Sequence, residues 1–579
     1  MSAPATPTSS SGGPVRGPTE SDELDTAVAA VRANAAAWAA TGVAERIALI
    51  DAIRRDAASV ADAWAAASIA VKGVDPDAPS SGEEALVGPY IVLRYLRSLR
   101  DALSDIDGHG TPRIAGGMRT RPDGQVVARV FPGSPYDRLF YPNVSADVWM
   151  EPGLTEGEVA GTQAVAYRAP DRAGHVCLVL GAGNTSSIGP MDILGKLFVE
   201  NEAVVFKPHP AISWLDPFLA LGLRVLVDRG VIRVVPGGAD VGARLCTDPR
   251  VDSVHVTGSQ ATYDAIVFGP GADGAARKSR GERILAKPVS AELGNVSPVI
   301  VVPGRWSSGD IASQAENLAS MLTNNAGFNC NATRVIVTHS NWPQREQLMA
   351  ALRAQLRRTP PRVAFYPGAA ARFDRFMAAH PEATQLGARA DDRLPWTIVE
   401  DVDPRQRDDI CFTTEAFCSV LAETALPAES PTDFLDRAVS FTNETLAGTL
   451  NATVIVKPAN ERHPSMARAV DRALTNLRYG TVSVNAWAAL GYGLSTLPWG
   501  AFPGNAPHEI GSGAGVVHNA LMFERPQKSV IQAPFRPWIK PAWYRSHRTA
   551  DRLAPRLVRF EASPSPTALP GIVALALRG

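Results

Sequence analysis

Cysteine is scarce in this chain, and no two cysteines stand at a metal-binding or redox spacing. The 579 residues include five cysteines, an odd number, and no CxxC motif occurs. Such a set argues against a disulfide framework and against a zinc site, and it suits a reducing compartment. The five are Cys177, Cys246, Cys330, Cys411 and Cys418.

An excess of charge of either sign is also missing. The chain has 57 basic and 58 acidic residues, which gives a formal net charge of -1. No overall field therefore favours nucleic acid or an anionic lipid surface. A small molecule is the expected partner.

Long apolar runs are missing as well. The apolar stretch "ALPGIVALAL" near the C-terminus has about half of the ~20 residues that a membrane-spanning helix needs. The start, "MSAPATPTSSSGGPVRGPTE", has neither a charged segment followed by an apolar core nor an amphipathic Arg-rich pattern, so residues 1–21 are interpreted as a disordered leader. Together these features predict a cytoplasmic protein.

The remaining pattern is that of a globular α/β protein. Hydrophobic residues make up 45% of the chain, and its length exceeds the size of one hydrophobic core, so at least two packed units are expected. Residues 22–72 and 80–105 have the spacing of amphipathic helices. Residues 175–259 then alternate strand-like runs ("HVCLVLGAG", "AVVFKPHP", "IRVVPGG", "VDSVHVTGS") with helix-like runs such as "GPMDILGKLFVEN". This alternation predicts a parallel sheet that binds ligands at the carboxyl ends of its strands.

Other segments complete the plan. A second α/β series runs from "SPVIVVPG" at 297 to "YGTVSVNAW". Residues 117–170 contain short β-like runs, "GQVVARVF" and "TQAVAYRAP", and are interpreted as an extended hairpin arm. Such an arm would be exposed in a monomer and predicts at least a dimer. Residues 531–579 are rich in Pro and Arg and are interpreted as a peripheral extension.

One cysteine stands at a turn that precedes a strand. Cys330 lies in "NNAGFNCNATRVIV", and a lone cysteine is more often buried and inert than nucleophilic. Its surroundings favour an accessible thiol instead, because Gly327 lets backbone approach closely and four nearby side chains are polar. These are Asn324, Asn325, Asn329 and Asn331.

Two more polar residues stand beside predicted strands. Glu292 in "AELGNVSP" lies between apolar neighbours; a carboxylate desolvated there would have a raised pKa and could act as a general base, although most Glu side chains are in water. Asn184 in "LGAGNTSSIGP" could donate an N–H to an oxyanion, although an Asn in a glycine-rich loop is more often a turn residue. This loop is not the GxGxxG dinucleotide fingerprint.

The next strand ends carry groups suited to a nucleotide. Lys207 ends the strand in "VVFKPHP" and is either a snorkelling edge residue or a contact to a ribose or phosphate. Gly258 and Ser259 in "VTGS" offer backbone amides to a pyrophosphate.

Taken in order, these stretches resemble the aldehyde dehydrogenase superfamily over about residues 22–530. The family's catalytic cysteine lies three residues after a glycine, which places it at Cys330 in "NNAGFNC". Its general base heads an "ELGG"-like motif, similar to "ELGN" at Glu292, 38 positions before Cys330. Its oxyanion asparagine and adenosine-ribose lysine are 23 positions apart, as are Asn184 and Lys207.

Two later stretches extend the resemblance. "EAFCSV" is similar to the family's "EIFGPV", which nominates Glu415 and Phe417 as contacts of the nicotinamide ribose. "PWGAFPGN", followed by "GSGAG", resembles the late substrate-side loop.

The resemblance implies an NAD(P)-dependent aldehyde dehydrogenase. Cys330 would attack the aldehyde, Asn184 and the Cys330 backbone amide would hold the oxyanion, and Glu292 would activate the water that hydrolyses the thioester to a carboxylic acid. NAD-preferring members often carry a Glu three residues after the lysine, where this chain has Pro210, so NAD or NADP is expected. The implied cofactor contacts are Lys207, Gly258, Ser259, Glu415 and Phe417.

The implied fold is α/β, with a Rossmann-like parallel-sheet cofactor domain, a second α/β catalytic domain and a β-hairpin oligomerisation arm. A homodimer or higher homo-oligomer is expected. The expected segments are the leader at 1–21; N-terminal helices, the arm (about 117–170) and the NAD(P)-binding domain at 22–296; the catalytic domain at 297–485; a return to the cofactor domain with the substrate-side loop at 486–530; and a C-terminal extension at 531–579.

Two other interpretations stay open. The "GAGN" loop, in place of an aromatic–Asn–Phe–Pro sequence, resembles the acyl-CoA reductase branch, so a CoA-dependent acyl-CoA reductase or acylating aldehyde dehydrogenase is the alternative. Retention of Glu292 disfavours it, because transfer to CoA has less need of a water-activating base. An inactive protein of the same fold is the least expected, since it would have little reason to keep polar groups at costly buried sites.

The substrate is not readable from the sequence. Phe328 stands where a Gln often precedes the nucleophile, and Tyr263 replaces a second glycine of the pyrophosphate turn. The aromatic residues Trp487, Tyr492 and Trp499 are equally plausible as substrate contacts and as packing.

Overall fold

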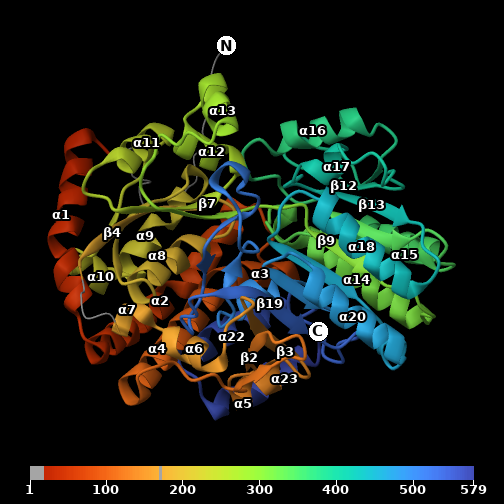
Figure 1. Ribbon diagram of the computed structural model, residues 1–579, viewed down its shortest axis with the longest axis horizontal. Helices are drawn as coiled ribbons and strands as arrows, with labels where there is room; N and C mark the ends of the chain where they lie inside the picture. The colour runs from red at the N-terminus through yellow and green to blue at the C-terminus, as the bar shows by residue number, and fades with distance from the viewer. Residues whose placement is uncertain (1–18, 169–172) are drawn as a thin grey trace.

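The computed structural model describes residues 19–168 and 173–579. Two large sheets lie side by side and helices cover them (Figure 1). The predicted leader comprises residues 1–21, of which residues 1–18 lie outside the described part of the chain. Helix α1 (Ser21–Ala40) begins at Ser21. Among the helices that the described ranges contain, none combines the length and the apolar character that crossing a membrane requires.

The first sheet has six strands in the order β17-β8-β7-β4-β5-β6. Its four predicted strands, β4 to β7, are confirmed; β8 joins them in parallel and β17 pairs antiparallel at the edge. The strands are β4 (His175–Leu180), β5 (Glu202–Lys207), β6 (Ile232–Val234), β7 (Ser253–Gly258), β8 (Val289–Leu293) and β17 (Gly513–Ala514).

The period of two along β4 explains how this sheet is buried on both faces. Val176 and Leu178 pack with the apolar side of α1, whereas Cys177 and Val179 belong to the core formed with α2 (Val43–Val71), α4 (Ile91–His109) and α8 (Ile188–Phe198). Alternate residues of a strand point to opposite faces, so a continuous apolar run fits a sheet that helices cover on both sides.

The second sheet has eleven strands in the order β1-β2-β3-β19-β15-β14-β9-β10-β13-β12-β11. Its central strands pair in parallel, as the second α/β series predicts. They are β9 (Pro298–Val301), β10 (Val335–His339), β12 (Trp396–Val399), β13 (Val420–Leu426), β14 (Asn451–Ile455) and β15 (Thr481–Val484), with β11 (Thr384–Leu386) at the edge. The helices over this sheet include α14 (Ser308–Thr323), α15 (Arg345–Arg357), α18 (Pro431–Thr445) and α20 (Pro464–Asn476).

The predicted arm is only partly a hairpin, and it does not stand alone. Strands β1 (Met118–Thr120), β2 (Val126–Phe131) and β3 (Ser145–Met150) form, but "TQAVAYRAP" contains helix α7 (Val165–Arg168), so the strand predicted there is wrong. Strand β3 pairs with β19 (Pro526–Gln532), and β19 pairs with β15 of the same chain. The arm therefore extends the chain's own sheet, and the exposure that suggested a dimer is absent at β3.

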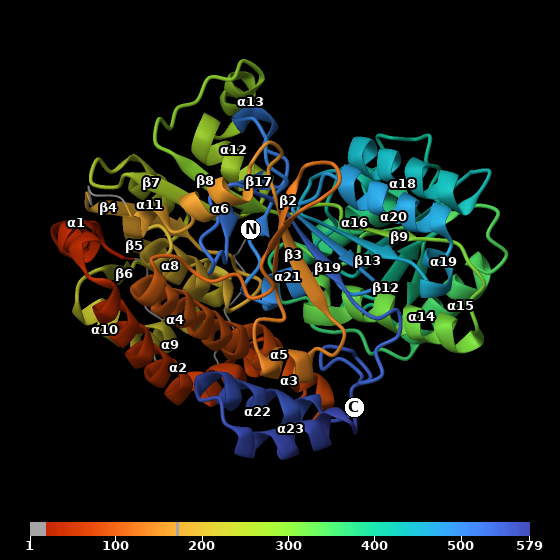
Figure 2. The same ribbon diagram turned by 60° about the horizontal axis from the view of Figure 1, so that its bottom comes forward.

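The C-terminal extension is packed rather than peripheral. It forms α22 (Ala550–Ala562) and α23 (Leu569–Ala576), and α22 contacts α2, α4 and the short helix α3 (Gly82–Ala85). Figure 2 shows α22 next to the N-terminal helices, with α23 on its outer side. The interpretation of residues 531–579 as peripheral is corrected by this packing.

Candidate active site

The polar residues expected at strand ends meet at one edge of the first sheet. Glu292 lies in β8 and Asn184 follows β4, and the neighbouring parallel strands bring their carboxyl ends together. Cys330 lies in the segment that leads into β10 of the second sheet. The Asn184 Nδ2 donates to the carbonyl oxygen of Phe328 at 2.9 Å, which ties the loop after β4 to the segment that carries Cys330.

The turn before Cys330 has a left-handed backbone. Asn325 and Ala326 have φ angles of 51° and 55°, and Gly327 has 82°. Only glycine adopts this region without cost, so the turn needs support from outside its own backbone. The Asn325 Nδ2 supplies it, because it lies within hydrogen-bonding distance of the carbonyl oxygens of Asn184 (2.9 Å) and Phe328 (3.1 Å).

Residues of the N-terminal helices brace the same turn. The buried Lys72 Nζ donates to Oδ1 of Asn325 at 2.8 Å and to Oε2 of Glu84 at 2.7 Å. Oε1 of Glu83 accepts the Asn325 backbone N–H at 2.7 Å. A buried charge is costly unless it is paired and hydrogen-bonded, and each of these groups has a partner.

Glu292 is a buried carboxylate beside the candidate nucleophile. Trp499 Nε1 donates to its Oε1 at 3.1 Å, and the Cys330 thiol lies near enough to influence the pKa of the carboxylate. Desolvation by burial raises the pKa of Glu292 to about 7 in spite of the Trp499 hydrogen bond, with the charge of Asp192 adding to the rise. A carboxylate with this pKa is suited to general base catalysis near neutral pH.

Cys330 has the exposure expected of a reactive thiol but not the low pKa. All five cysteines are described, and Cys330 alone among them is not buried. Desolvation, followed by the charges of Glu292 and Glu415, raises the pKa of the thiol well above its ordinary value. The resting sulfur is therefore a protonated thiol, and its attack requires a base that takes the proton.

Donors for an oxyanion converge near this sulfur. An amide group has two N–H donors, and one of those on Asn184 is committed to Phe328. Among the described residues, no backbone carbonyl oxygen accepts from the backbone N–H of Cys330. One donor on each residue is therefore available to a developing negative charge.

Two side chains expected to contact the cofactor, Glu415 and Lys207, are shielded from solvent and make few hydrogen bonds. The Oε1 of Glu415 has no hydrogen-bond partner within the described chain, and burial raises the pKa of this carboxylate to about 7. Lys207 ends β5, and among the residues that the structure describes its Nζ donates only to the Pro208 carbonyl oxygen, at 3.5 Å; burial lowers the pKa of the ammonium. A Cβ on Gly294 would lie 1.8 Å from Oε2 of Glu415, which explains the glycine of "ELGN".

The other expected cofactor residues have local structural roles as well. Gly258 ends β7, and the Ser259 hydroxyl accepts the Thr262 backbone N–H at the start of α12 (Gln260–Phe268). Phe417 packs against the rings of Phe328 and Tyr366.

A cavity of about 320 Å³ opens beside Cys330 and Asn184. Trp487 and Tyr492 line it, whereas Trp499 contacts Glu292. Residues between 533 and 577 also line it, and sequence reasoning missed them because this segment has no regular apolar period. The Trp499 contact was missed as well, since no sequence signal distinguishes an indole that orients a carboxylate from one that packs.

This chain is similar, in part of its sequence and in its fold, to aldehyde dehydrogenases. Residues 173–389 match the aldehyde dehydrogenase family. Betaine aldehyde dehydrogenase of Cereibacter sphaeroides is 34% identical over 197 residues, which cover 32% of this chain and 36% of that protein. The chain thus spans about a third of the length of the curated relatives it matches.

Solved structures match over most of the chain. Aldehyde dehydrogenase C of Pseudomonas syringae, complexed with NAD+ and octanal, has a TM-score of 0.57 and 19% identity, covering 89% of this chain and 90% of that one. The Bacillus halodurans glyceraldehyde-3-phosphate dehydrogenase complexed with NADP has a TM-score of 0.57 and 19% identity, covering 88% and 91%. This likeness confirms the expected α/β fold class.

The left-handed turn gives a stability prediction. Gly327→Ala should destabilise the protein by about 2–4 kcal/mol, because the new Cβ is strained at positive φ and crowds its neighbours. That Cβ would lie 2.5 Å from the Cys418 carbonyl oxygen. The measurement is the melting temperature at a fixed scan rate.

The matched control is Gly161→Ala in the short exposed helix α6 (Glu156–Thr162), where an added Cβ meets nothing within 4 Å. It should leave the melting temperature unchanged or raise it slightly. Equal melting temperatures for Gly327→Ala and the wild type would contradict the assigned backbone.

Proposed function

Because the chain belongs to the aldehyde dehydrogenase superfamily, we propose that it oxidises an aldehyde to a carboxylic acid with NAD(P)+, through a thioester on Cys330. The observation that carries the proposal is the juxtaposition of the Cys330 thiol, which lines a cavity together with Asn184, and the buried Glu292 carboxylate, each of which shifts the pKa of the other. The CoA-dependent alternative gains no support, since this arrangement favours hydrolysis by an activated water.

The first step is addition of the thiol to the aldehyde. The Sγ–C bond forms while the thiol proton passes to the Glu292 carboxylate, which must be ionised to accept it. The carbonyl electron pair moves onto oxygen. The oxyanion accepts hydrogen bonds from Asn184 Nδ2 and the Cys330 backbone N–H, which are already in place before the charge develops.

The second step converts this adduct to the acid. Bound NAD(P)+ supplies the two-electron acceptor for the hydrogen that leaves the substrate carbon. The carbonyl re-forms as a thioester on Sγ, and Glu292 releases its proton to solvent. Glu292 then takes a proton from a water that adds to the thioester carbon, the C–S bond breaks, and Sγ regains a proton. One aldehyde, one water and one NAD(P)+ give one carboxylate, one NAD(P)H and two protons.

The residues fit an NAD(P) cofactor. The unpartnered Oε1 of Glu415 and the ammonium of Lys207 are groups that ribose hydroxyls would satisfy. Gly258 and Ser259 at the end of β7 would meet the pyrophosphate, and Phe417 would lie against the nicotinamide side. Pro210 places no carboxylate near a 2'-phosphate, so both NAD and NADP are proposed.

A cytoplasmic location and a homodimer or higher homo-oligomer stay predictions. The edge of β3 does not require a partner subunit, because β19 of the same chain pairs with it.

Replacing the nucleophile gives the first kinetic prediction. Cys330→Ala should abolish NAD(P)H formation from aldehyde while NAD+ binding, followed by calorimetry, stays within about twofold of the wild type, because no cofactor contact is removed. Wild-type turnover should need no CoA.

Retained turnover in Cys330→Ala would reject this nucleophile. A wild-type rate that appears only when CoA is added would reject hydrolysis in favour of acyl transfer to a thiol.

The raised pKa of Glu292 gives a pH prediction. Because the base works only when ionised, kcat/KM should fall about tenfold per pH unit as the pH drops below about 7, and it should level off above that value. Glu292→Gln should turn over slowly, and its kcat/KM should no longer fall as the pH drops below about 7. The measurement is kcat/KM between pH 5.5 and 9.

Glu415→Gln is the matched control, because this carboxylate also has a pKa raised to about 7. In this variant kcat/KM should still fall at low pH, but the fall should begin at a lower pH, because one negative charge that raises the pKa of Glu292 is gone. If the fall of kcat/KM at low pH disappeared in Glu415→Gln and persisted in Glu292→Gln, Glu415 rather than Glu292 would be the general base.

A further inference from the structure

We infer that the substrate is an aldehyde with a long, uncharged hydrocarbon chain, and that the C-terminal extension, residues 533–579, forms the outer wall of its binding cavity. This inference rests on the proposed function. It follows from the lining of the cavity, the pairing of its charges, its exposed rim and the way the extension is anchored.

The lining of the cavity combines polar and apolar side chains. Cys330 and several asparagines line it, as do Leu86 and Ile91 from the N-terminal helices and Leu553 and Leu557 from α22. A carbonyl group would find hydrogen-bond donors near Cys330, and a hydrocarbon chain would leave water against the apolar side chains.

The cavity offers no counter-charge to a charged substrate. Of the described residues that line it, only Glu83 and Lys540 carry charge. Glu83 pairs with Arg362 at 2.8 Å, and Lys540 pairs with Glu316 at 3.5 Å and donates to the Ser546 hydroxyl at 2.7 Å. A charged tail would be desolvated here without a partner, which is costly.

The rim of the cavity is apolar and open to solvent. Three of its lining side chains are large hydrophobic groups with high exposure: Leu139 (42%), Trp538 (69%) and Leu577 (58%). Single exposed apolar residues are common, but a set at one opening indicates a site for an apolar ligand. Two of the three belong to the extension.

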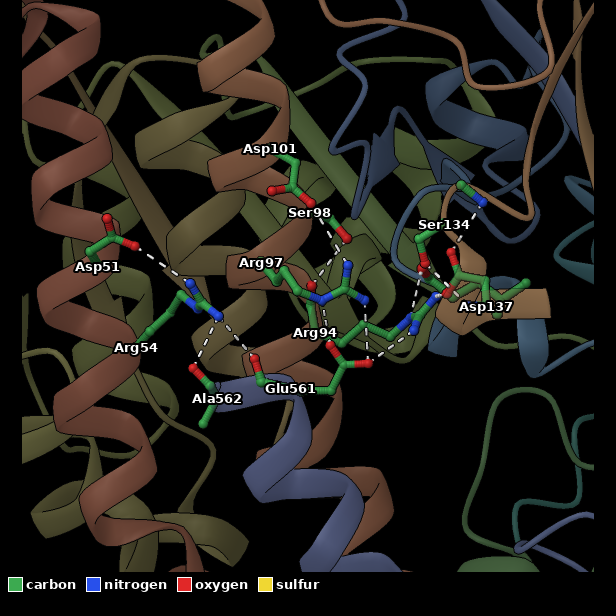
Figure 3. Close-up of polar contacts among 12 residues, drawn as sticks. Asp51, Arg54, Arg94, Arg97, Ser98, Asp101, Ser134, Asp137, Glu561 and Ala562 are labelled. Carbon is green, nitrogen blue, oxygen red and sulfur yellow. Dashed lines mark hydrogen bonds and ion pairs between the residues drawn. The ribbon is translucent and has the colours of Figure 1, made fainter. Parts of the chain in front are cut away.

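Buried ion pairs hold the extension in this place. Glu561 at the end of α22 is 1% exposed; its carboxylate accepts from Arg94 at 3.0 Å and from Arg97 at 2.7 Å, and Arg94 also binds Asp137 at 2.9 Å (Figure 3). Breaking a buried pair is costly because the remaining charge has no partner. Helix α22 therefore has one favoured position on α4.

Further contacts agree with that position. Arg54 Nη2 donates to the carbonyl oxygens of Glu561 (3.1 Å) and Ala562 (3.0 Å) (Figure 3). These carbonyl groups in the last turn of α22 thereby gain a hydrogen-bond partner. At the other end, a Cβ on Gly82 would lie 2.2 Å from the Ala550 carbonyl oxygen, so only glycine allows this approach of α3. The wall that Leu553 and Leu557 form is thus a fixed part of the folded chain.

The test is a chain-length series of saturated aldehydes, propanal to decanal, with NAD+ and with NADP+. Each methylene that enters the cavity should raise kcat/KM by about fourfold, so butanal and octanal should differ on the order of a hundredfold. A flat or falling series, or preference for an aldehyde of matched length that carries a trimethylammonium group, would overturn the inference.

Variants locate the effect in the extension. Leu557→Gln keeps the approximate size of the side chain and places an amide in the wall, so it should lower the increase in log kcat/KM per methylene. Leu221→Gln is the control, because Leu221 is 56% exposed on α9 (Asp216–Gly222), outside the cavity. Val573→Thr, in α23, repeats the test with a nearly isosteric change in case Leu557→Gln fails to fold. Equal increases in the Leu557→Gln, Val573→Thr and wild-type proteins would reject the extension as the wall.

Binding of 1-decanol and 1-butanol, measured by calorimetry without cofactor, separates this inference from the proposed function. Tighter binding of 1-decanol that Leu557→Gln weakens, together with no oxidation of any aldehyde, would reject the proposed function and keep the assigned ligand class. Oxidation of butanal, with the same kcat/KM along the series and no binding of 1-decanol, would keep the proposed function and reject the assigned ligand class.

Discussion

The hydrogen bonds of one side chain, Asn325, hold the turn on which the candidate site depends. Its amide reaches the carbonyl oxygens of Asn184 and Phe328, and its Oδ1 accepts from the buried Lys72. These bonds compensate for two consecutive non-glycine residues with positive φ, Asn325 and Ala326. They also join three parts of the chain: the N-terminal helices, the loop after β4 and the segment before β10. The position of Cys330 relative to Asn184 follows from this junction.

Once Cys330 is placed there, its protonation follows from its surroundings. Desolvation is the main cause that raises the pKa of the thiol, and the nearby carboxylates Glu292 and Glu415 add to it, so the thiol is held protonated. A sulfur in this state is protected from oxidants, whose target is the thiolate. Desolvation also gives Glu292 a pKa near neutrality, so a group that helps to keep the thiol protonated is also suited to deprotonate it when an electrophile arrives.

Much of the fold could be predicted because its strands are continuous apolar runs between glycine and proline turns. Residues at strand ends could be predicted as a set, since parallel strands bring their carboxyl ends together. The helix at Val165–Arg168 could not, because four residues contain too little periodicity to separate helix from strand. Nor could the contact of Trp499 with Glu292, or the place of α22 in the lining of the cavity that Cys330 also lines, since both depend on residues more than 200 positions apart. The pairing of β3 with β19 is non-local in the same way.

The central claim is that Cys330 carries the acyl group and that Glu292 directs its hydrolysis. The most direct measurement is peptide mass analysis of Glu292→Gln after prolonged reaction with octanal and NAD+ above pH 8, where hydroxide takes the thiol proton in place of Glu292, and an acid quench. The account predicts an octanoyl adduct on the Cys330 peptide that hydroxylamine removes and that Cys330→Ala lacks. NADH formation without an adduct on Cys330, or an adduct on another residue, would contradict it.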